Sequence, residues 1–267
     1  MGAANARICI YLLRDADPAF DALDERWSDV LSDDELARAC RFRFARHARQ
    51  SRLAHALKRH ALSMHCPKIA PADWRFAVAD HGKPYVADVA DAPVFNLSHS
   101  DGMIALAVGP PAGTGLRLGV DVEAMNRQVS EGVAERFFAP REVADLRALP
   151  QDARDDRFFA LWALKESYIK AVGMGLAIPL DSFAFRFAGA GGRSLSFRAD
   201  REERSEDWRF CQTVLVGPGG DGHSLALAVG AVGQTRRLEV ELREITPDGE
   251  ARPQAVQWFR SSTAAGK

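Results

Sequence analysis

Two acidic residues in the segment GVDVE have the spacing of a metal or phosphate site. Asp121 and Glu123 lie two apart in a stretch that alternates apolar and polar residues. This alternation predicts a β-strand, on which residues two apart project from the same face. Such a pair is more often the solvated face of a half-buried strand. Gly119 on that same face favours the other interpretation, because it lets something approach the backbone closely.

A second segment, FFALWALKESYIKAVGMGL from Phe158 to Leu176, has apolar residues at helical spacing. Glu166 and Lys170 are four residues apart, so their side chains share one helical face. A surface salt bridge between them would explain the pair, with the stem of Lys165 packed on the apolar stripe. The alternative is that these charges serve a ligand.

If the strand and the helix meet, Asp121, Glu123 and Glu166 place three carboxylates together. Their charges would repel and raise one another's pKa. Mg²⁺ would relieve that repulsion, because it prefers carboxylate and phosphate oxygens, and Mn²⁺ is the alternative ion. Lys165 and Lys170 would then bind phosphate oxygens that the metal leaves uncovered.

The elements around these residues predict an α+β protein. Ser32 and Glu35 have the spacing of a capping box at the start of a helix. A strand-turn-strand is expected in VFNLSHSDGMIALAVG and a further strand in GTGLRLGVDVE. The other expected helices and strands are, in order, helices 32–40, 47–64, 130–137, 140–148 and 154–173, and strands 7–13, 182–187, 194–198, 208–216, 223–231 and 236–243.

An internal echo indicates a duplication. GMIALAVG (102–109) and HSLALAVG (223–230) share ALAVG at an offset of 121 residues. The expected fold is therefore a pseudo-two-fold pair of α/β halves, each with a small antiparallel sheet packed on helices. The active site is expected in the cleft between them. The halves are predicted as 1–113 and 114–245, the second with the metal carboxylates, followed by a tail over 246–267.

Composition excludes several classes of protein. The 267 residues include 35 basic and 36 acidic side chains, so nothing favours general nucleic-acid binding. Four scattered cysteines, without CxxC spacing, argue against a zinc site and a disulfide framework. The apolar run ICIYLL reads as a first strand rather than a signal peptide, and no run is long enough to span a membrane. A cytoplasmic protein is expected.

The motifs resemble those of the Sfp-type 4'-phosphopantetheinyl transferases. The family pattern G-[IV]-D-[IV]-E, then W-x-x-K-E-[SA]-x-x-K, reads here as Gly119 to Glu123, then Trp162, Lys165, Glu166, Ser167 and Lys170. HGKPYV, FNLSHSDG and FFAPREVADL are similar to three further family motifs, the last with Glu142 at its acidic position. The resemblance covers residues 42 to 187.

The resemblance implies a reaction and a site. The family moves the phosphopantetheine arm of coenzyme A onto a serine of an acyl or peptidyl carrier protein and releases adenosine 3',5'-bisphosphate. Its metal ligands correspond to Asp121, Glu123 and Glu166, and its phosphate-contacting lysine to Lys170. Glu166, directly or through a water, is the expected base. Lys83, Ser98 and His99 are implied at the adenosine-phosphate end of coenzyme A.

One family contact departs from the pattern. The family usually has an arginine on its long N-terminal helix that reaches the coenzyme A phosphates, and Gln50 falls near that position. Arg49 or Arg52 is expected to substitute.

The carrier-binding surface is expected between the carboxylate strand and the catalytic helix. Some of Arg127, Arg136 and Arg141 would face the acidic carrier, while Phe137 and Phe138 either join them or cover the core. The duplication suggests a monomer.

Two other functions remain open. An acidic strand followed by KES superficially resembles a Mg²⁺-dependent nuclease, although Glu166 and Lys170 have helical spacing. A non-catalytic module that binds coenzyme A or a carrier protein is the second alternative.

Overall fold

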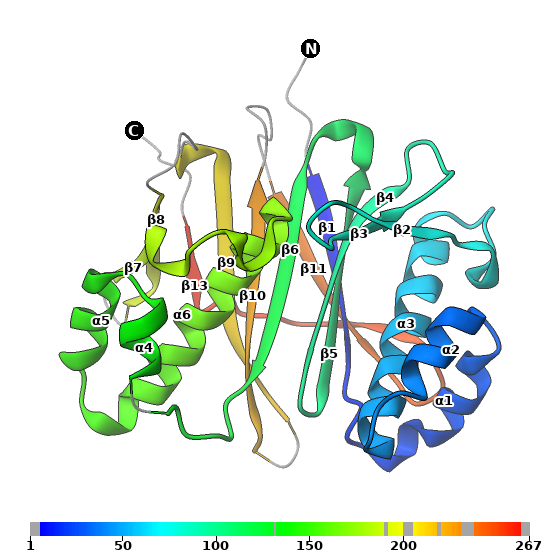
Figure 1. Cartoon of the computed structure of the whole chain (residues 1–267), viewed down its shortest axis with the longest axis horizontal. Helices are drawn as coiled ribbons and strands as arrows, with labels where there is room; N and C mark the ends of the chain where they lie inside the picture. The colour runs from blue at the N-terminus through cyan, green and yellow to red at the C-terminus, as the bar shows by residue number, and fades with distance from the viewer. Residues whose placement is uncertain are drawn as a thin grey trace. The chain divides into compact units, whose positions relative to one another are not determined.

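The computed structural model describes residues 6–130, 132–189, 192–199, 205–217, 220–230 and 238–262 (Figure 1). The chain forms two compact units. The first comprises the described residues of 1–79, 84–115 and 235–256, and the second those of 80–83, 116–234 and 257–267. Both units combine sheets with helices, so the α+β fold is confirmed.

The first unit contains a five-stranded sheet in the order β12-β11-β1-β5-β4. The strands β1 and β11 run parallel, and the other neighbours are antiparallel. Three helices, a core that includes Leu53, Leu57 and Trp74, and a separate pair β2-β3 complete the unit. The bounds are β1 (Ala6–Leu13), α1 (Asp21–Ser28), α2 (Asp33–Ala39), α3 (Ala45–His65), β2 (Phe76–Val78), β3 (Pro84–Val86), β4 (Pro93–Ser100), β5 (Met103–Pro111), β11 (Leu238–Ile245) and β12 (Ala251–Gln254).

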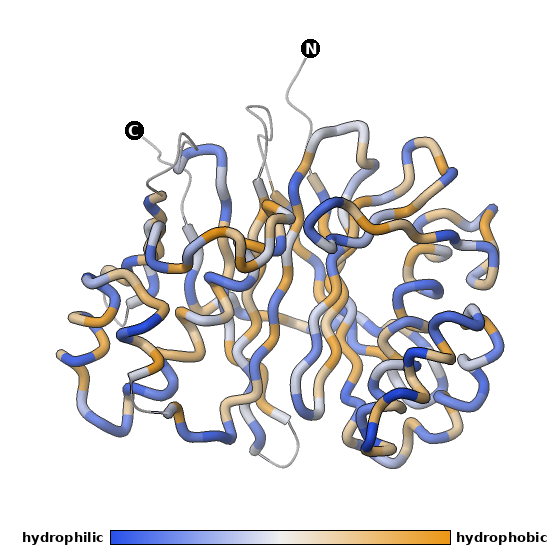
Figure 2. The backbone as a smooth tube through the Cα atoms, viewed as in Figure 1, coloured by the Kyte–Doolittle hydropathy of each residue, from blue (hydrophilic) through white to orange (hydrophobic). Residues whose placement is uncertain are grey.

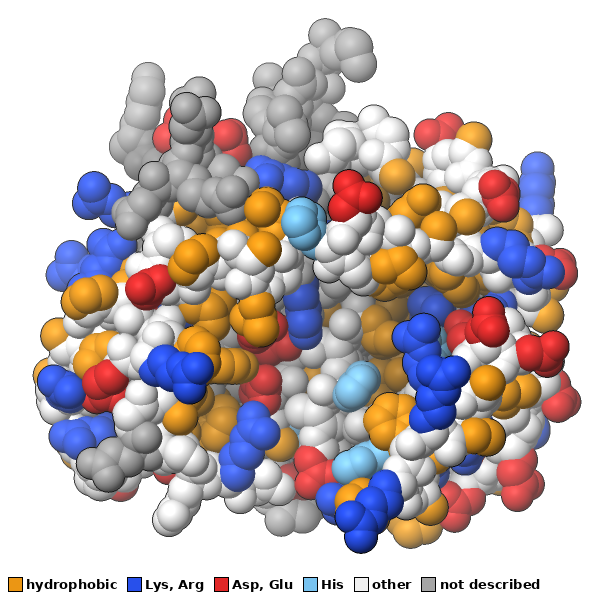
Figure 3. Space-filling model, in the orientation of Figure 1, with side chains coloured by type: hydrophobic (Ala, Val, Ile, Leu, Met, Phe, Trp, Pro, Cys, Tyr) orange, Lys and Arg blue, Asp and Glu red, His pale blue; other side chains and the backbone are white. Residues whose placement is uncertain are grey.

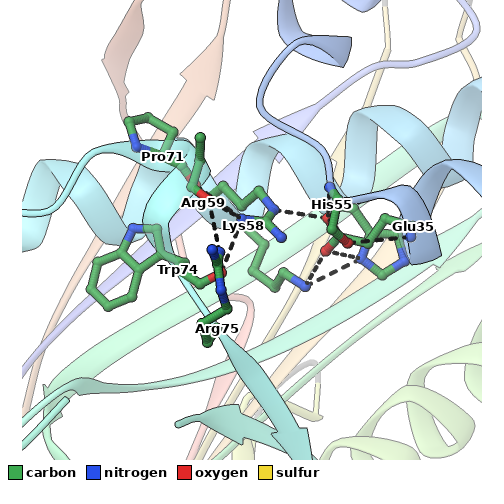
Figure 4. Close-up of polar contacts among 9 residues, drawn as sticks. Glu35, His55, Lys58, Arg59, Pro71, Trp74 and Arg75 are labelled. Atoms are coloured by element: carbon green, nitrogen blue, oxygen red, sulfur yellow. Dashed lines mark hydrogen bonds and ion pairs between the residues drawn. The ribbon is translucent and has the colours of Figure 1, made fainter. Parts of the chain in front are cut away.

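Glu35 joins α2 to α3 through a buried charge network (Figure 4). Its side chain completes the expected capping box with Ser32. Its two oxygens also accept hydrogen bonds from Lys58 Nζ at 3.0 Å and Arg59 Nε at 2.8 Å. Burial opposes the charge of Glu35, but His55, Lys58 and the backbone of Ser32 outweigh it and lower its pKa. Burial also lowers the pKa of Lys58 to about 8.

Several basic side chains of α3 are neutralised inside the unit. Arg52 pairs with Asp24 on α1, and Arg49 Nη1 lies 3.1 Å from Asp21 Oδ1. Arg59 reaches Glu35 and also donates to the carbonyl of Trp74. On the face drawn in Figure 3, basic and acidic side chains are interspersed. These three arginines therefore hold α3 against its neighbouring elements.

The second unit contains a six-stranded sheet in the order β6-β10-β9-β13-β8-β7, in which only β13 and β8 are a parallel pair among the described residues. Its core is rich in aromatic rings, with Tyr168 at the centre of contacts to Phe183, Phe197 and Trp208. The bounds are β6 (Arg117–Ala124), α4 (Val133–Phe137), α5 (Pro140–Arg147), α6 (Gln151–Val172), β7 (Phe183–Ala188), β8 (Ser194–Ala199), β9 (Trp208–Val216), β10 (Gly222–Gly230) and β13 (Arg260–Ser261).

The two units repeat one arrangement of elements. In the first, a strand, a long helix and a hairpin follow as β1, α3, β4 and β5, with sheet order β1-β5-β4. In the second, β6, α6, β9 and β10 follow with order β6-β10-β9. The repeated ALAVG lies on β5 and β10, the middle strand of each trio. The duplicated architecture predicted from the sequence is confirmed.

The C-terminal part of the chain differs from the expectation. The strand predicted over 236–243 was assigned to the C-terminal half, but β11 pairs with β1 in the first unit, and residues 236–237 lie outside the described residues. The tail predicted over 246–267 supplies β12 to one sheet and β13 to the other. These strands are short, and β12 contains Pro253, so their periodicity is too weak to predict them.

Hydrophilic and hydrophobic residues alternate along the helices (Figure 2). This is the pattern of helices with one face on a core and one in water. Within the described part of the chain, no helix has the length and apolar character needed to cross a bilayer.

Candidate active site

The close approach of β6 and α6 brings the acidic strand to the charged helix. Gly119 makes this approach possible, because a Cβ atom there would overlap the carbonyl oxygen of Ser167 and the amide nitrogen of Ala171. The sequence analysis expected something to approach the backbone at Gly119, and that partner is α6. Asp121 and Glu123 follow on the same strand, beside Glu166 and Lys170 on the helix.

Two cations contact the strand carboxylates directly. Lys170 Nζ donates to Asp121 Oδ1 at 2.6 Å, and only 3% of the Asp121 side chain is exposed. Arg127, which follows β6, donates from Nη2 to Glu123 Oε2 at 2.6 Å. The sequence predicted a pairing of Lys170 with Glu166, four residues earlier on the helix; its ammonium acts on Glu166 electrostatically and also reaches the strand at Asp121.

The three carboxylates lie within electrostatic reach of one another. Burial raises the pKa of Glu123 to about 7, and the charges of Asp121 and Glu166 add to this rise while Arg127 and Lys170 oppose it. Burial and then Asp121 raise the pKa of Glu166, opposed by Lys170. The mutual repulsion anticipated from the sequence is therefore present.

This donor set fits a hard divalent cation, because carboxylate oxygens are ligands that Mg²⁺ prefers. The side chains are nevertheless not arranged as a ready-made ion cage. Across the described ranges, no group of three or more His, Cys, Asp or Glu side chains meets the geometry of a metal site.

Lys165 is buried in the core rather than placed at a phosphate. Its Nζ lies 2.7 Å from Glu142 Oε2 and donates to the carbonyls of Leu180 at 2.7 Å and Phe183 at 2.8 Å. These contacts use the three donors of an ammonium group, and the side chain is fully buried. The prediction that Lys165 binds the cofactor does not fit this environment, and the structural alternative does.

Glu142 completes the same network. Its oxygens accept hydrogen bonds from the amides of Ala139 at 3.0 Å and Phe185 at 2.8 Å. Burial raises the pKa of Glu142 and lowers that of Lys165, while each charge opposes the shift of the other. The pair joins α5, α6 and β7, so it holds the helix that carries Glu166.

Lys83 belongs to the second unit and contacts the same strand and helix. Its Nζ donates to the carbonyls of Leu118 at 3.0 Å and Ala171 at 2.9 Å. Burial, followed by the charge of Arg117, lowers the pKa of Lys83 to about 8. Lys83 is therefore not a solvated loop lysine.

Ser98 and His99 lie in the first unit, on β4. They pair with Ala105 and Ile104 on β5, so they belong to the first strand of the expected strand-turn-strand. Ser98 is buried and His99 is exposed. The turn itself is formed by Asp101 and Gly102, with Gly102 at a φ of +82°.

The helix α3 faces a cavity of about 430 Å³ beside that turn. Gln50 lies in its wall and donates to the carbonyl of Ser100 at 2.8 Å and to the carboxylate of Asp15. Arg49 also lines the cavity, although it donates to the carbonyl of Asp17 and pairs with Asp21, whereas Arg52 lines no part of it. Arg46 and His47, which the sequence analysis missed, line the cavity as well. Their spacing from Gln50, three and four residues, is the signal that could have found them.

The segment between β6 and α6 has some side chains in the core and others on the surface. Phe138 is buried, and Phe137 packs on Trp162 with ring centres 5.8 Å apart. Both phenylalanines therefore cover the core, which settles the alternative left open for them. Arg136 and Arg141 are exposed.

Comparisons with known proteins agree with this geometry. The family model described as the 4'-phosphopantetheinyl transferase superfamily matches residues 117–228, which contain β6 and α6. The 4'-phosphopantetheinyl transferase ffp of Bacillus subtilis is 36% identical over 162 residues, which are 61% of this chain and 69% of that protein. The transferase Sfp of Bacillus subtilis strain 168 is 34% identical over 163 residues, with the same coverage of both chains. The transferase HetI of a Nostoc species is 37% identical over 151 residues, or 55% of this chain and 62% of that protein.

A carboxylate strand packed on a lysine-bearing helix is compatible with a phosphoryl-transfer site. The chain belongs to the 4'-phosphopantetheinyl transferase superfamily and is of the Sfp type. It is therefore an enzyme of the phosphopantetheinyl transferase class.

Proposed function

We propose that this transferase moves the 4'-phosphopantetheine arm of coenzyme A onto a serine of an acyl or peptidyl carrier protein and releases adenosine 3',5'-bisphosphate. The observation that carries the proposal is the meeting of Asp121, Glu166 and Lys170 within the segment that matches the family. The carrier serine oxygen bonds to the β-phosphorus, and the bond from that phosphorus to the bridging oxygen breaks.

Asp121, Glu123 and Glu166 are the residues that would hold Mg²⁺. When bound, the ion supplies positive charge to the pyrophosphate. Mn²⁺ is the chemical alternative, because it accepts the same oxygen ligands.

Glu166 and Lys170 would transfer the protons of the reaction and stabilise the negative charge that develops on the leaving group. Glu166 accepts the proton of the carrier serine, preferably through one water, because a carboxylate that binds a metal is a weak base. Its raised pKa favours this role. Lys170 stabilises the negative charge that grows on the bridging oxygen and can protonate it. Its hydrogen bond to Asp121 holds the ammonium close to the carboxylates that would hold the metal.

The other end of coenzyme A would lie on cationic and hydroxyl groups named above. Ser98 and His99 would contact the 3'-phosphate, and Lys83 the adenosine-phosphate end, as in the family. Arg49 and Arg52 are already paired with aspartates, so we propose that Arg46 and His47 provide the helix contact instead. Arg46 Nε donates to His47 Nε2 at 3.3 Å, so the two side chains lie together at the cavity and the Nη groups of Arg46 would contact the anion.

Arg136 and Arg141 would contact the acidic recognition helix of the carrier. Both are exposed near α4 and α5, on the segment between the carboxylate strand and α6. We also propose a cytoplasmic monomer. The free state of the four cysteines is compatible with a reducing compartment.

The reaction can be tested by mass spectrometry of an apo carrier protein incubated with coenzyme A, Mg²⁺ and this chain. We expect the carrier to gain one phosphopantetheine arm. The gain should disappear with EDTA and fall by at least about 100-fold in Asp121→Ala, since positioned charge is the main source of catalysis here. Binding of coenzyme A without any gain of carrier mass would instead identify a non-catalytic module.

A further inference from the structure

Arg127 has a position that the proposed reaction does not use. It follows β6 by three residues and donates from Nη2 to Glu123 Oε2 at 2.6 Å. The Arg127 side chain is 60% exposed, whereas that of Glu123 is 15% exposed. The guanidinium therefore approaches the carboxylate from the solvent side. Its carbon also lies 5.4 Å from the ring of Phe159 on α6, so the side chain has a second support beside the site.

This contact competes with metal binding. A divalent cation on Glu123 would lie close to the guanidinium, and the two positive charges would repel one another. Metal binding to Glu123 therefore weakens its contact with Arg127, and that contact in turn opposes metal binding.

Release of Arg127 changes the surface around the site. A freed guanidinium beside the carboxylates, on the segment that leads into α4, is a donor for acidic side chains. The partner chemistry that fits is a carboxylate-rich helix, which the guanidinium can bind more fully once the metal has displaced it from Glu123.

We propose that Arg127 is a latch on Glu123 that the metal displaces, and that the released guanidinium then binds an acidic side chain of the carrier protein. This inference rests on the proposed function, because it assumes the metal site and the carrier. Thermodynamic linkage makes the effect reciprocal: the metal increases carrier affinity, and the carrier increases metal affinity by the same factor.

The effect of Arg127 on metal binding is tested by titrating the full chain with Mn²⁺. Binding is measured as the loss of the electron paramagnetic resonance signal of free Mn²⁺. We expect the dissociation constant for Mn²⁺ to fall about two- to five-fold in Arg127→Ala, as for loss of one partly exposed ion pair. Arg147→Ala is the matched control, because it breaks an exposed pair with Glu135 away from the site and should leave the constant unchanged.

The carrier half is tested with an apo carrier whose modified serine is replaced by alanine, so that no turnover occurs. Calorimetry should show tighter carrier binding to wild type with Mn²⁺ than without it. This difference should disappear in Arg127→Ala and persist in Arg147→Ala.

An unchanged or weaker Mn²⁺ affinity in Arg127→Ala overturns the proposal that Arg127 is a latch on Glu123. If Mn²⁺ still tightens carrier binding in that variant, the proposed contact between Arg127 and the carrier is overturned. Either result leaves the proposed reaction standing if wild type binds Mn²⁺ and Asp121→Ala does not. Failure of wild type to bind Mn²⁺ at all overturns both the latch and the proposed metal site.

Discussion

Lys165 and Glu166 are consecutive residues that α6 sends to different environments. Lys165 enters the core and is held by Glu142 and two carbonyls, while Glu166 lies toward Asp121. A helix turns about 100° per residue, so one step separates a core position from a site position. The motif K-E thus encodes a structural anchor followed directly by the proposed catalytic group.

Lys165→Met tests the anchor. It leaves the Glu142 carboxylate buried without its cation, so we expect the free energy of unfolding to fall by about 3–5 kcal/mol. The double variant Glu142→Gln with Lys165→Met removes both charges and should recover part of that loss. Chemical denaturation measures all three proteins. A Lys165→Met protein with wild-type stability and lost activity would place the ammonium on the substrate instead.

The strand β6 and the helix α6 are packed with their backbones in close contact. The contact at Gly119 sets the depth at which α6 packs, and this depth sets the distance between the strand carboxylates and the helix charges. The glycine is therefore as important to the site as the acids that follow it.

Gly119→Ala should separate the two elements. Because backbone atoms of Ser167 and Ala171 cannot yield as a side chain can, we expect a loss of about 2–3 kcal/mol in unfolding free energy. Transfer activity should fall about 100-fold from misplacement alone. Gly222→Ala, where the nearest atoms of Met125 are 3.7 Å away, is the control and should change neither quantity much. Equal behaviour of the two variants in thermal unfolding and carrier modification would contradict this account.

Local patterns were sufficient to predict most elements and the carboxylate group. The helices expected over 47–64 and 154–173 are observed as α3 and α6, and the alternation around Asp121 is that of β6. The ion-pair partners of the charged residues were harder to predict from the sequence, because Arg52, Lys58 and Lys165 pair with residues on other elements. Their roles depend on tertiary packing, which period and spacing do not encode. The helix α1 was missed because its eight residues make only about two turns, too short for a clear helical period.

At the scale of the whole molecule, the two units are not consecutive in sequence. The strand β11 lies more than a hundred residues after β5, yet it pairs with β1 over seven residues from Ala6 to Leu12. Nearly all of β1 is buried, so its apolar surface depends on a partner from the far end of the chain.

A fragment of residues 1–115 should therefore fail to fold cooperatively. It contains the three helices and β1, β4 and β5, but its β1 edge has no partner from β11. We expect no sharp thermal transition by circular dichroism. Addition of a peptide of residues 238–256, which supplies β11 and β12, should restore one. A fragment that melts cooperatively alone would show that the late strand is dispensable.

The late arrival of β11 also has a consequence during synthesis on the ribosome. At about 5–20 residues per second, β11 leaves the ribosome roughly ten seconds after β5. Throughout that interval β1 presents an unpaired, apolar edge to the surroundings. A nascent chain of this kind is a natural client for chaperones that cover exposed strands, and slowed translation past residue 111 would lengthen the period at risk of aggregation.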